Sequence, residues 1–311
     1  MEEMEYKPKF RQRYSELTDW NKFVEYSSKF LRRSIRVNTL KIDIENLKER
    51  IQEQWRLEPI SWCPEGFFID HKGEGDEYRR DVGNLIEHSL GYIFIQEASS
   101  MIPPRVLKPK PGEFILDMCA SPGSKTTQIA QYMNNEGLLF SNDYKADRNK
   151  ALGLNVQRMG VINALMTLKD GKRFMGFQFD RILVDAPCSG TGTIRKSPKT
   201  LKIWNPNMVK RLAITQRALI EAAFNNLKPG GTLVYSTCTL EPEEDEGVIS
   251  YLLNKHENAQ TEEIELDIKK SPPVMEFDGT TFNPGVRNCL RIWPQDNDTD
   301  GFFVCRIKKT F

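Results

Sequence analysis

The chain has 311 residues, 39% of them hydrophobic, and a formal net charge of +1. This length allows one sizeable core plus a smaller module. The near-neutral charge excludes a global field that attracts polyanions, so any nucleic-acid binding must use local basic patches. No segment approaches the roughly 18 apolar residues of a membrane span, and the charged start of the chain lacks the apolar core of a signal peptide. We therefore expect no membrane partner.

The six cysteines have no C-x-x-C spacing, and the three histidines are far from them in sequence. This pattern argues against a structural zinc site, and we expect no metal. Unpatterned cysteines in a chain of this length are typical of a reduced compartment, so we expect a cytoplasmic protein.

The first third of the chain predicts a small α+β module, which we place at residues 1–95. Residues 1–30 are polar with scattered aromatic residues and indicate helix. Residues 34–42 alternate between apolar and polar side chains, as a strand does. Asp43 then offers an N-cap for a helix, and residues 65–70 predict a further strand.

From residue 96 to residue 311, strands and helices alternate. Such alternation predicts an α/β fold, with a parallel sheet covered by helices on both faces. The turn Pro229–Gly231 leads into the last parallel strand, and a pair of strands at 290–293 and 302–307 closes the sheet. The expected parallel strands are 113–118, 138–141, 162–167, 179–184 and 232–235, and the expected helices are 125–133, 146–159, 206–227 and 241–253.

Three of the expected strands run into loops with unusual chemistry. These loops are C-A-S-P-G-S-K-T (Cys119–Thr126), D-A-P-C-S-G-T-G (Asp185–Gly192) and S-T-C-T (Ser236–Thr239). Ligands of open α/β sheets bind at the carboxyl ends of the strands, so the three loops predict one site. Free cysteines are usually small buried hydrophobic residues. Cys188 and Cys238 instead stand in polar loops rich in glycine and threonine, which indicates covalent catalysis.

The first loop could bind a ligand or could be a simple tight turn between a strand and a helix. Its small residues allow close approach, and the helix start offers free N–H groups. A phosphate-binding P-loop is excluded, because it needs glycine where this chain has Cys119 and Ser124. Asp143 and Asp170 follow the next two strands. An acid at the second strand end typically binds ribose hydroxyls, although Asp143 could cap a helix and Asp170 could belong to an ordinary turn.

These motifs resemble the RsmB/NOP (Sun-type) family of RNA cytosine-5 methyltransferases, which use S-adenosylmethionine. The chain departs from the family pattern at Ser121 and Ser124, where alanine and glycine are usual, and at Gln295, where histidine is common and to which we assign no role. Besides the three loops, the resemblance rests on R-V-N-T-L-K (Arg36–Lys41), Q-E-A-S-S-M (Gln96–Met101) and W-P…D-G-F-F (Trp293–Phe303).

The resemblance implies a Rossmann-like class I methyltransferase sheet, mostly parallel with a closing antiparallel strand pair. It also implies the catalytic roles. Cys238 adds to carbon 6 of cytosine, Asp185 holds the ring nitrogen and the exocyclic amine, Lys125 orients Asp185, and Cys188 assists proton removal from carbon 5 and product release. An unperturbed thiol is only a few per cent ionised at pH 7, so the site must favour the thiolate.

The family's cofactor, S-adenosyl-L-methionine, implies a second set of residues. Asp143 binds the ribose with Arg148 nearby, Asp170 meets the adenine amine, and Asp185 lies close to the methionine end. The residues expected to face the methionine moiety are Cys119, Ala120, Ser121, Pro122, Gly123, Ser124 and Lys125.

Local clusters of basic residues predict where RNA binds, although a solvated surface with uneven charge is the alternative. The candidates, from charge and position alone, are Arg36, Arg195, Lys196 and Lys199. The target base must leave its stack to reach the thiol. The compact chain resembles tRNA-modifying members, so we expect a monomer that acts on tRNA ahead of rRNA. The alternatives are an rRNA enzyme, a methyltransferase for amines, oxygen or protein, and an RNA-binding scaffold with a residual cofactor pocket.

Overall fold

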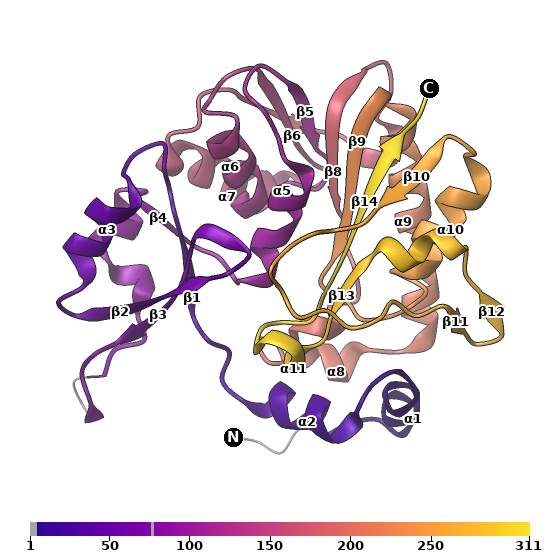
Figure 1. The fold of residues 1–311 in the computed structure, drawn as a ribbon, viewed down its shortest axis with the longest axis horizontal. Coiled ribbons are helices and arrows are strands. Elements are labelled where there is room, and N and C mark those ends of the chain that lie inside the picture. Colours follow the sequence, from indigo (N-terminus) through magenta and orange to yellow (C-terminus); the bar gives the residue numbers. More distant parts are fainter. Residues whose placement is uncertain (1–4, 76–77) are drawn as a thin grey trace.

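The structure is a computed structural model that describes residues 5–75 and 78–311. A small antiparallel sheet and a larger mixed sheet lie side by side (Figure 1). Strands of the small sheet follow the order β2-β3-β1-β4, and Leu47 and Ile51 of helix α3 pack on it. The elements of this part are β1 (Ser34–Val37), α3 (Ile44–Ile51), β2 (Trp55–Ile60), β3 (Cys63–His71), α4 (Ile86–Ser89) and β4 (Ile93–Ile95).

The larger sheet has the order β10-β14-β9-β8-β5-β6-β7, with β13 paired to β14. The run from β9 to β7 is parallel, and β14 is antiparallel to both of its neighbours in that order. This confirms the expected class I sheet with its closing antiparallel pair. The strands are β5 (Phe114–Asp117), β6 (Leu138–Asp143), β7 (Ala164–Leu168), β8 (Phe179–Asp185), β9 (Leu227–Thr237), β10 (Ala259–Glu262), β13 (Leu290–Ile292) and β14 (Phe302–Lys309).

Helices cover both faces of the larger sheet, because successive strand residues point to opposite faces. Leu183 and Val234 face the core formed with α5, α6 and α7, whereas Ile182 and Leu233 face the core formed with α9 and α10. The helices are α5 (Ile102–Leu107), α6 (Ser124–Tyr132), α7 (Ala146–Met159), α8 (Lys199–Ile203), α9 (Pro206–Asn225), α10 (Glu246–Lys255) and α11 (Pro294–Asn297).

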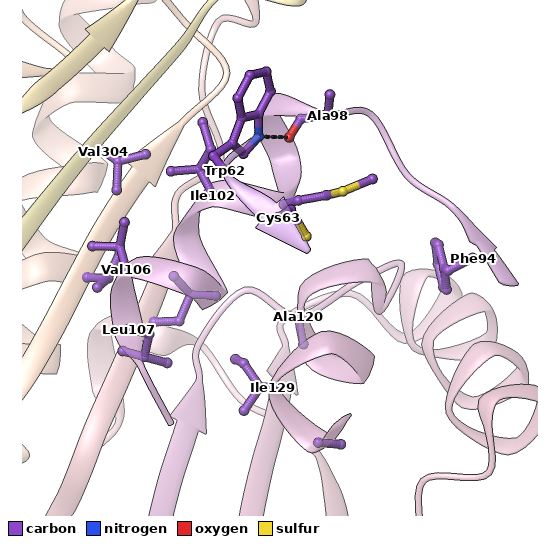
Figure 2. Packing of buried hydrophobic residues seen from close by; sticks show 14 of the residues in the cluster. Trp62, Cys63, Phe94, Ala98, Ile102, Val106, Leu107, Ala120, Ile129 and Val304 are labelled. Atoms are coloured by element: carbon purple, nitrogen blue, oxygen red, sulfur yellow. Dashed lines mark hydrogen bonds between the residues drawn. The ribbon is translucent and has the colours of Figure 1, made fainter. Parts of the chain in front are cut away.

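The small sheet shares a hydrophobic core with the larger one. Trp62 and Cys63 pack in the same cluster as Ile102 and Val106 of helix α5 (Figure 2). The indole nitrogen of Trp62 donates a hydrogen bond of 3.0 Å to the carbonyl oxygen of Ala98. Burying such side chains contributes roughly 1.5–3 kcal/mol each, so the two sheets are held together by apolar contact.

The first two helices, α1 (Pro8–Leu17) and α2 (Trp20–Ser28), pack away from the small sheet. Phe10, Tyr14 and Phe23 form a cluster with Trp204 and Trp293 of the larger unit. The structure thus places α1 and α2 against the larger unit, below its sheet in Figure 1.

Two expected boundaries are wrong. Pro229–Gly231 lies within β9 instead of forming a turn before it, and the ladder with β8 shifts register at this point. Helix α10 begins at Glu246 instead of residue 241, because residues 241–245 form a buried turn. Among the described residues, no helix combines the length and apolar character that crossing a bilayer requires.

Candidate active site

The three motif loops meet at the carboxyl edge of the larger sheet, because β5, β8 and β9 are neighbours. The Sγ atoms of Cys188 and Cys238 lie 3.4 Å apart. Asp185 ends β8, and Lys125 lies in the first turn of α6. The structure thus brings together all of the side chains that the sequence assigned to catalysis.

Asp185 is held by hydrogen bonds to both of its carboxylate oxygens. Lys125 Nζ lies 2.7 Å from Oδ2, and Ser236 Oγ donates to Oδ1 at 2.8 Å. Lys125 also donates to Ser100 Oγ at 3.0 Å. Burial disfavours the ammonium ion, but the attraction of Asp185 outweighs burial, so the pKa of Lys125 is raised. Lys125 therefore stays charged and fixes the carboxylate.

The two thiols differ in their tendency to ionise. The hydrogen bond between them, together with burial and nearby Glu244, raises the pKa of Cys188. The same hydrogen bond lowers the pKa of Cys238, where burial and Asp185 oppose the shift and Lys125 supports it. These opposite shifts of the two pKa values favour Cys238 as the thiolate.

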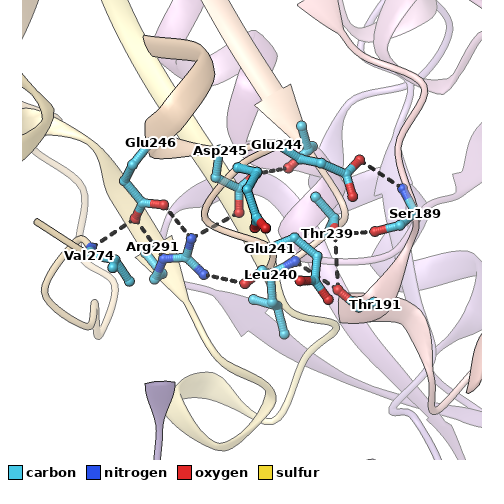
Figure 3. A network of polar contacts seen from close by, with 12 residues as sticks. Ser189, Thr191, Thr239, Leu240, Glu241, Glu244, Asp245, Glu246, Val274 and Arg291 are labelled. Atoms are coloured by element: carbon cyan, nitrogen blue, oxygen red, sulfur yellow. Dashed lines mark hydrogen bonds and ion pairs between the residues drawn. The ribbon is translucent and has the colours of Figure 1, made fainter. Parts of the chain in front are cut away.

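A buried polar network joins the two cysteine loops (Figure 3). The hydroxyl groups of Ser189 and Thr191 lie 2.7 and 2.9 Å from Thr239 Oγ1. Thr191 Oγ1 also accepts from the Leu240 N–H at 3.0 Å, and Glu244 accepts from the Ser189 N–H at 3.0 Å. These bonds fix the residues that follow Cys188 and Cys238.

Arg291 neutralises the acidic turn behind this network. Its guanidinium donates to Glu246 at 2.8 and 2.6 Å and to Asp245 at 3.0 Å, and it also binds the Leu240 carbonyl oxygen at 3.1 Å. The three charged side chains are 0% exposed. Burial raises the pKa of Glu244 to about 7. The sequence had suggested an ordinary helix start here, and Arg291 gave no signal of its role.

The first loop and the end of β6 are connected through Arg148. Arg148 donates to the Ser121 carbonyl oxygen at 2.8 Å, and Ser121 Oγ donates back to the Arg148 carbonyl oxygen at 2.7 Å. Arg148 also lies 3.4 Å from Asp143 Oδ2, while the Lys145 N–H binds Oδ1 at 3.1 Å. Asp143 is therefore placed beside the loop that begins at Cys119, as expected for a ribose-binding acid.

Buried carboxylate oxygens at this edge suit the donors that the cofactor carries. Among the described residues, Asp143 Oδ2 and Asp117 Oδ1 are buried without a hydrogen-bond partner. Ribose hydroxyls and an ammonium group supply donors of that kind, so the residues fit S-adenosylmethionine. Asp117 accepts from Thr126 Oγ1 at 2.7 Å, and burial raises its pKa to about 7. Sequence reasoning missed Asp117, although a carboxylate ending an apolar strand was a usable signal.

Asp170 makes only local polar contacts within the described part of the chain. Its carboxylate accepts from the Lys172 N–H at 3.1 Å and lies 3.6 Å from Lys172 Nζ. At the end of β6, the side-chain amide of Asn142 donates a hydrogen bond of 3.0 Å to the carbonyl oxygen of the neighbouring Lys169. Asp170 thus lies at the same sheet edge, and its assignment to adenine stays a prediction.

The prediction that Arg36 contacts RNA is wrong. Its side chain is 0% exposed, and its guanidinium donates to Gln96 Oε1 at 2.5 Å, the Ser124 carbonyl oxygen at 2.7 Å and Thr127 Oγ1 at 2.8 Å. Arg36 therefore holds the first turn of α6, which carries Lys125.

Arg195 is a second correction. Its side chain is 1% exposed and pairs with Asp298 at 2.9 Å, and it also donates to the Phe30 carbonyl oxygen at 2.8 Å. Lys196 and Lys199 are exposed, as RNA contact requires. Gln295 donates to Thr18 Oγ1 at 2.8 Å, so it joins α11 to the N-terminal helices.

Comparison with known proteins identifies the family. The family model described as 16S rRNA methyltransferase RsmB/F matches residues 104–308, and that of the N-terminal domain of 16S rRNA methyltransferase RsmF matches residues 6–98. The chain belongs to the RsmB/F family. It is an S-adenosylmethionine-dependent RNA cytosine-5 methyltransferase, as the resemblance of its motifs implied.

Relatives with different substrates resemble this RsmB/F member. The tRNA (cytosine(49)-C(5))-methyltransferase of Pyrococcus abyssi is 48% identical over 98% of this chain and 99% of its own length. Ribosomal RNA small subunit methyltransferase F of Shewanella oneidensis is 45% identical over 93% of this chain, which spans only 60% of that relative. The structure of NSun6 from Pyrococcus horikoshii with SFG has a TM-score of 0.86 at 25% identity and covers 99% of both chains.

Proposed function

We propose that this RsmB/F enzyme methylates carbon 5 of a cytosine in tRNA through a covalent bond between Cys238 and the base. The single observation that carries the mechanism is the pair of thiols 3.4 Å apart with Lys125 and Asp185 beside them. The relative named for tRNA matches this chain along nearly its full length, whereas the ribosomal relative extends well beyond it. The higher identity of the tRNA enzyme, 48% against 45%, supports tRNA as the substrate.

The thiolate of Cys238 performs the first step. Carbon 5 of cytosine is too electron-poor to accept a methyl group, and addition of sulfur at carbon 6 makes carbon 5 nucleophilic. Asp185, held by Lys125 and Ser236, binds the ring nitrogen and exocyclic amine of the base and favours the adduct. S-adenosylmethionine, when held by the loop from Cys119 and by Asp143, supplies the methyl group.

Cys188 acts when the adduct breaks down. The proton passes from carbon 5 to solvent water, the electron pair of that C–H bond restores the ring double bond, and the bond between carbon 6 and Cys238 breaks with its electrons returning to sulfur. The Cys188 thiol, which keeps its proton, donates a hydrogen bond to the departing thiolate. Such a bond to an anion is stronger than one to a neutral acceptor, so Cys188 assists release.

Substitution of each thiol tests these roles. We expect Cys238→Ala to abolish methylation while leaving cofactor binding intact, and Cys188→Ala to accumulate a protein–RNA adduct that migrates slowly on a denaturing gel. Cys289→Ala is the matched control, because this buried cysteine lies in the core on the α9 and α10 face. Turnover by Cys238→Ala would refute the mechanism, and lost activity without an adduct would refute the role of Cys188.

The RNA substrate needs a separate test. Bisulfite sequencing of tRNA and 16S rRNA, from cells with and without the gene, should show a cytosine in tRNA that loses its methyl group. A lost methyl group in rRNA alone would overturn the tRNA assignment and keep the chemistry.

Three further features belong to this proposal. We propose that the enzyme acts as a monomer, since both thiols, Asp185 and the cofactor loop come from one chain. We propose a division near residue 95, where β4 ends at Ile95. We also propose a cytoplasmic location, because two close thiols that must stay reduced require a reducing compartment.

A further inference from the structure

A cleft of about 640 Å³ opens between the small sheet and the catalytic unit. Its walls combine residues 30–34 after α2, residues of β2 and β3, residues 78–80, residues 95–97 at and after the end of β4, and Arg195 and Lys196. It is separate from the cysteine pair, and sequence reasoning did not predict it.

The cleft is strongly basic although the chain as a whole is nearly neutral. Seven of its lining residues are arginine or lysine, against three aspartates or glutamates. Three of the arginines pair with carboxylates. The exposed cations for which the described part of the chain provides no ion pair are Arg33, Arg56, Arg80 and Lys196. Among the described residues of the walls, these four cations outnumber the two acids that form no ion pair, Asp70 and Glu97, and this excess of positive charge favours a polyanionic ligand.

Exposed aromatic rings line the same cleft. Phe30 is 68% exposed and Tyr78 is 39% exposed. The Arg80 guanidinium carbon lies 4.6 Å from the centre of the Phe30 ring and 5.4 Å from that of Tyr78. Exposed rings beside cations are the platform on which unpaired nucleic-acid bases stack.

The inner end of the cleft reaches the active site through Glu97. Its carboxylate accepts from the Asp300 N–H at 3.1 Å and the Ser100 N–H at 3.2 Å. Ser100 Oγ in turn accepts from Lys125. Asp300 also interacts electrostatically with both Lys196 and Cys238. The inner wall of the cleft is therefore connected through Glu97 and Ser100 to Lys125 in the active site.

We propose that this cleft binds a single-stranded segment of the substrate RNA next to the target cytosine. The phosphates lie against Arg33, Arg56 and Arg80, and one base stacks on Phe30. This inference rests on the proposed function, because the target base must be unstacked to reach Cys238. Unstacking leaves flanking bases with exposed faces, which suits an aromatic platform better than a duplex surface does.

The test measures RNA binding directly, apart from methylation. The probe is a fluorescent single-stranded RNA of about ten nucleotides with one cytosine, a length within the usual range for such sites, and the same sequence as a duplex. The variants are the triple substitution of Arg33, Arg56 and Arg80 to glutamine, and Phe30→Ala. A matched control replaces three exposed cations that do not line the cleft, Lys210, Arg211 and Arg287.

Each variant has its own expected signature. The triple substitution should weaken single-strand binding and reduce the slope of log affinity against log salt by about 2, because each phosphate contact contributes roughly 0.7. Phe30→Ala should lose about 5- to 100-fold in affinity with an unchanged slope, and Phe30→Trp should restore binding. The control triple substitution should change neither quantity beyond a small screened effect.

Two results would overturn the cleft. One is that the triple variant binds the single strand as tightly as the control variant does. The other is that the unaltered enzyme binds the duplex as tightly as the single strand. Thermal melting with and without S-adenosylmethionine shows that each variant folds. If the unaltered enzyme methylates cytosine while the cleft variants bind RNA normally, the cleft fails and the proposed function stands. If it methylates no RNA cytosine, the proposed function fails whatever the cleft binds.

Discussion

Replacing Arg291 with leucine tests how the acidic turn behind the cysteines is stabilised. The substitution removes the hydrogen bonds to Glu246, Asp245 and the Leu240 carbonyl oxygen, all in a region that excludes water. Breaking a buried ion pair by removing one partner costs about 3–5 kcal/mol. We therefore expect Arg291→Leu to lower the free energy of unfolding by that amount at pH 7.

The same magnitude follows from proton uptake. A buried carboxylate without its partner takes up a proton, and protonating a group with an ordinary pKa of about 4.3 costs about 3.7 kcal/mol at pH 7. Burial already raises the pKa of Asp245, so we count the uptake of one further proton, by one carboxyl group of the turn. The folded variant then binds a proton that its unfolded state lacks, so its stability falls as pH rises. The deficit should shrink by about 1.4 kcal/mol per pH unit from pH 7 towards pH 5.

Urea denaturation followed by tryptophan fluorescence at pH 5, 6 and 7 measures the deficit. Arg306→Leu is the matched control, because Arg306 also lies on a strand of the larger sheet but pairs with the half-exposed Glu262 at 2.5 Å. Exposed pairs contribute about 0.2–1 kcal/mol. A deficit for Arg291→Leu that matches the control, or one that does not change with pH, would refute the reasoning.

Three further substitutions probe the same site. Asp117→Asn should stabilise the fold, because the pKa of Asp117 is raised to about 7. The gain in free energy of unfolding should grow from pH 4 to about pH 7, reach at most about 4 kcal/mol and stay constant at higher pH. Denaturation at several pH values measures it. Gly192→Ala should destabilise by about 1–3 kcal/mol or more and reduce activity, because its methyl group would lie 2.2 Å from the Gly301 carbonyl oxygen and 2.8 Å from that of Cys238. Gly83→Ala, with its nearest neighbour at 3.8 Å, should leave the melting temperature and activity nearly unchanged. Trp204→Phe should lower the free energy of unfolding by about 1–3 kcal/mol, because it removes the 2.8 Å hydrogen bond to Glu241. Urea denaturation measures this loss.

The catalytic residues could be predicted from sequence because the constraint is topological. Parallel strands end at one edge of the sheet, so motifs that follow β5, β8 and β9 had to converge. The convergence of the three loops follows from that rule, whereas the pairing of Lys125 with Asp185 and the roles of Cys188 and Cys238 were implied by the resemblance to the family. Helix α7 was predicted over the range that the structure shows, residues 146–159.

The errors arose where burial depends on distant parts of the chain. Arg36 alternates with Ile35 and Val37, which suggested a solvent-facing side chain. The structure covers it with α6, some ninety residues later in the sequence, as its bond to Ser124 shows. The acids that begin at Glu241 resemble an ordinary helix start, and their partner Arg291 lies on β13. Local patterns carry no information about such pairings.

The same turn links folding stability to the asymmetry of the two sulfur atoms. Glu244 fixes the loop after Cys188 through Ser189, and its negative charge helps to keep the proton on Cys188. Lys125, on the other side, favours the thiolate of Cys238. Sequence order cannot decide which cysteine attacks the base, because both follow a strand end. The contact between the two sulfur atoms lowers the pKa of Cys238 and raises that of Cys188, and this difference favours Cys238 as the nucleophile.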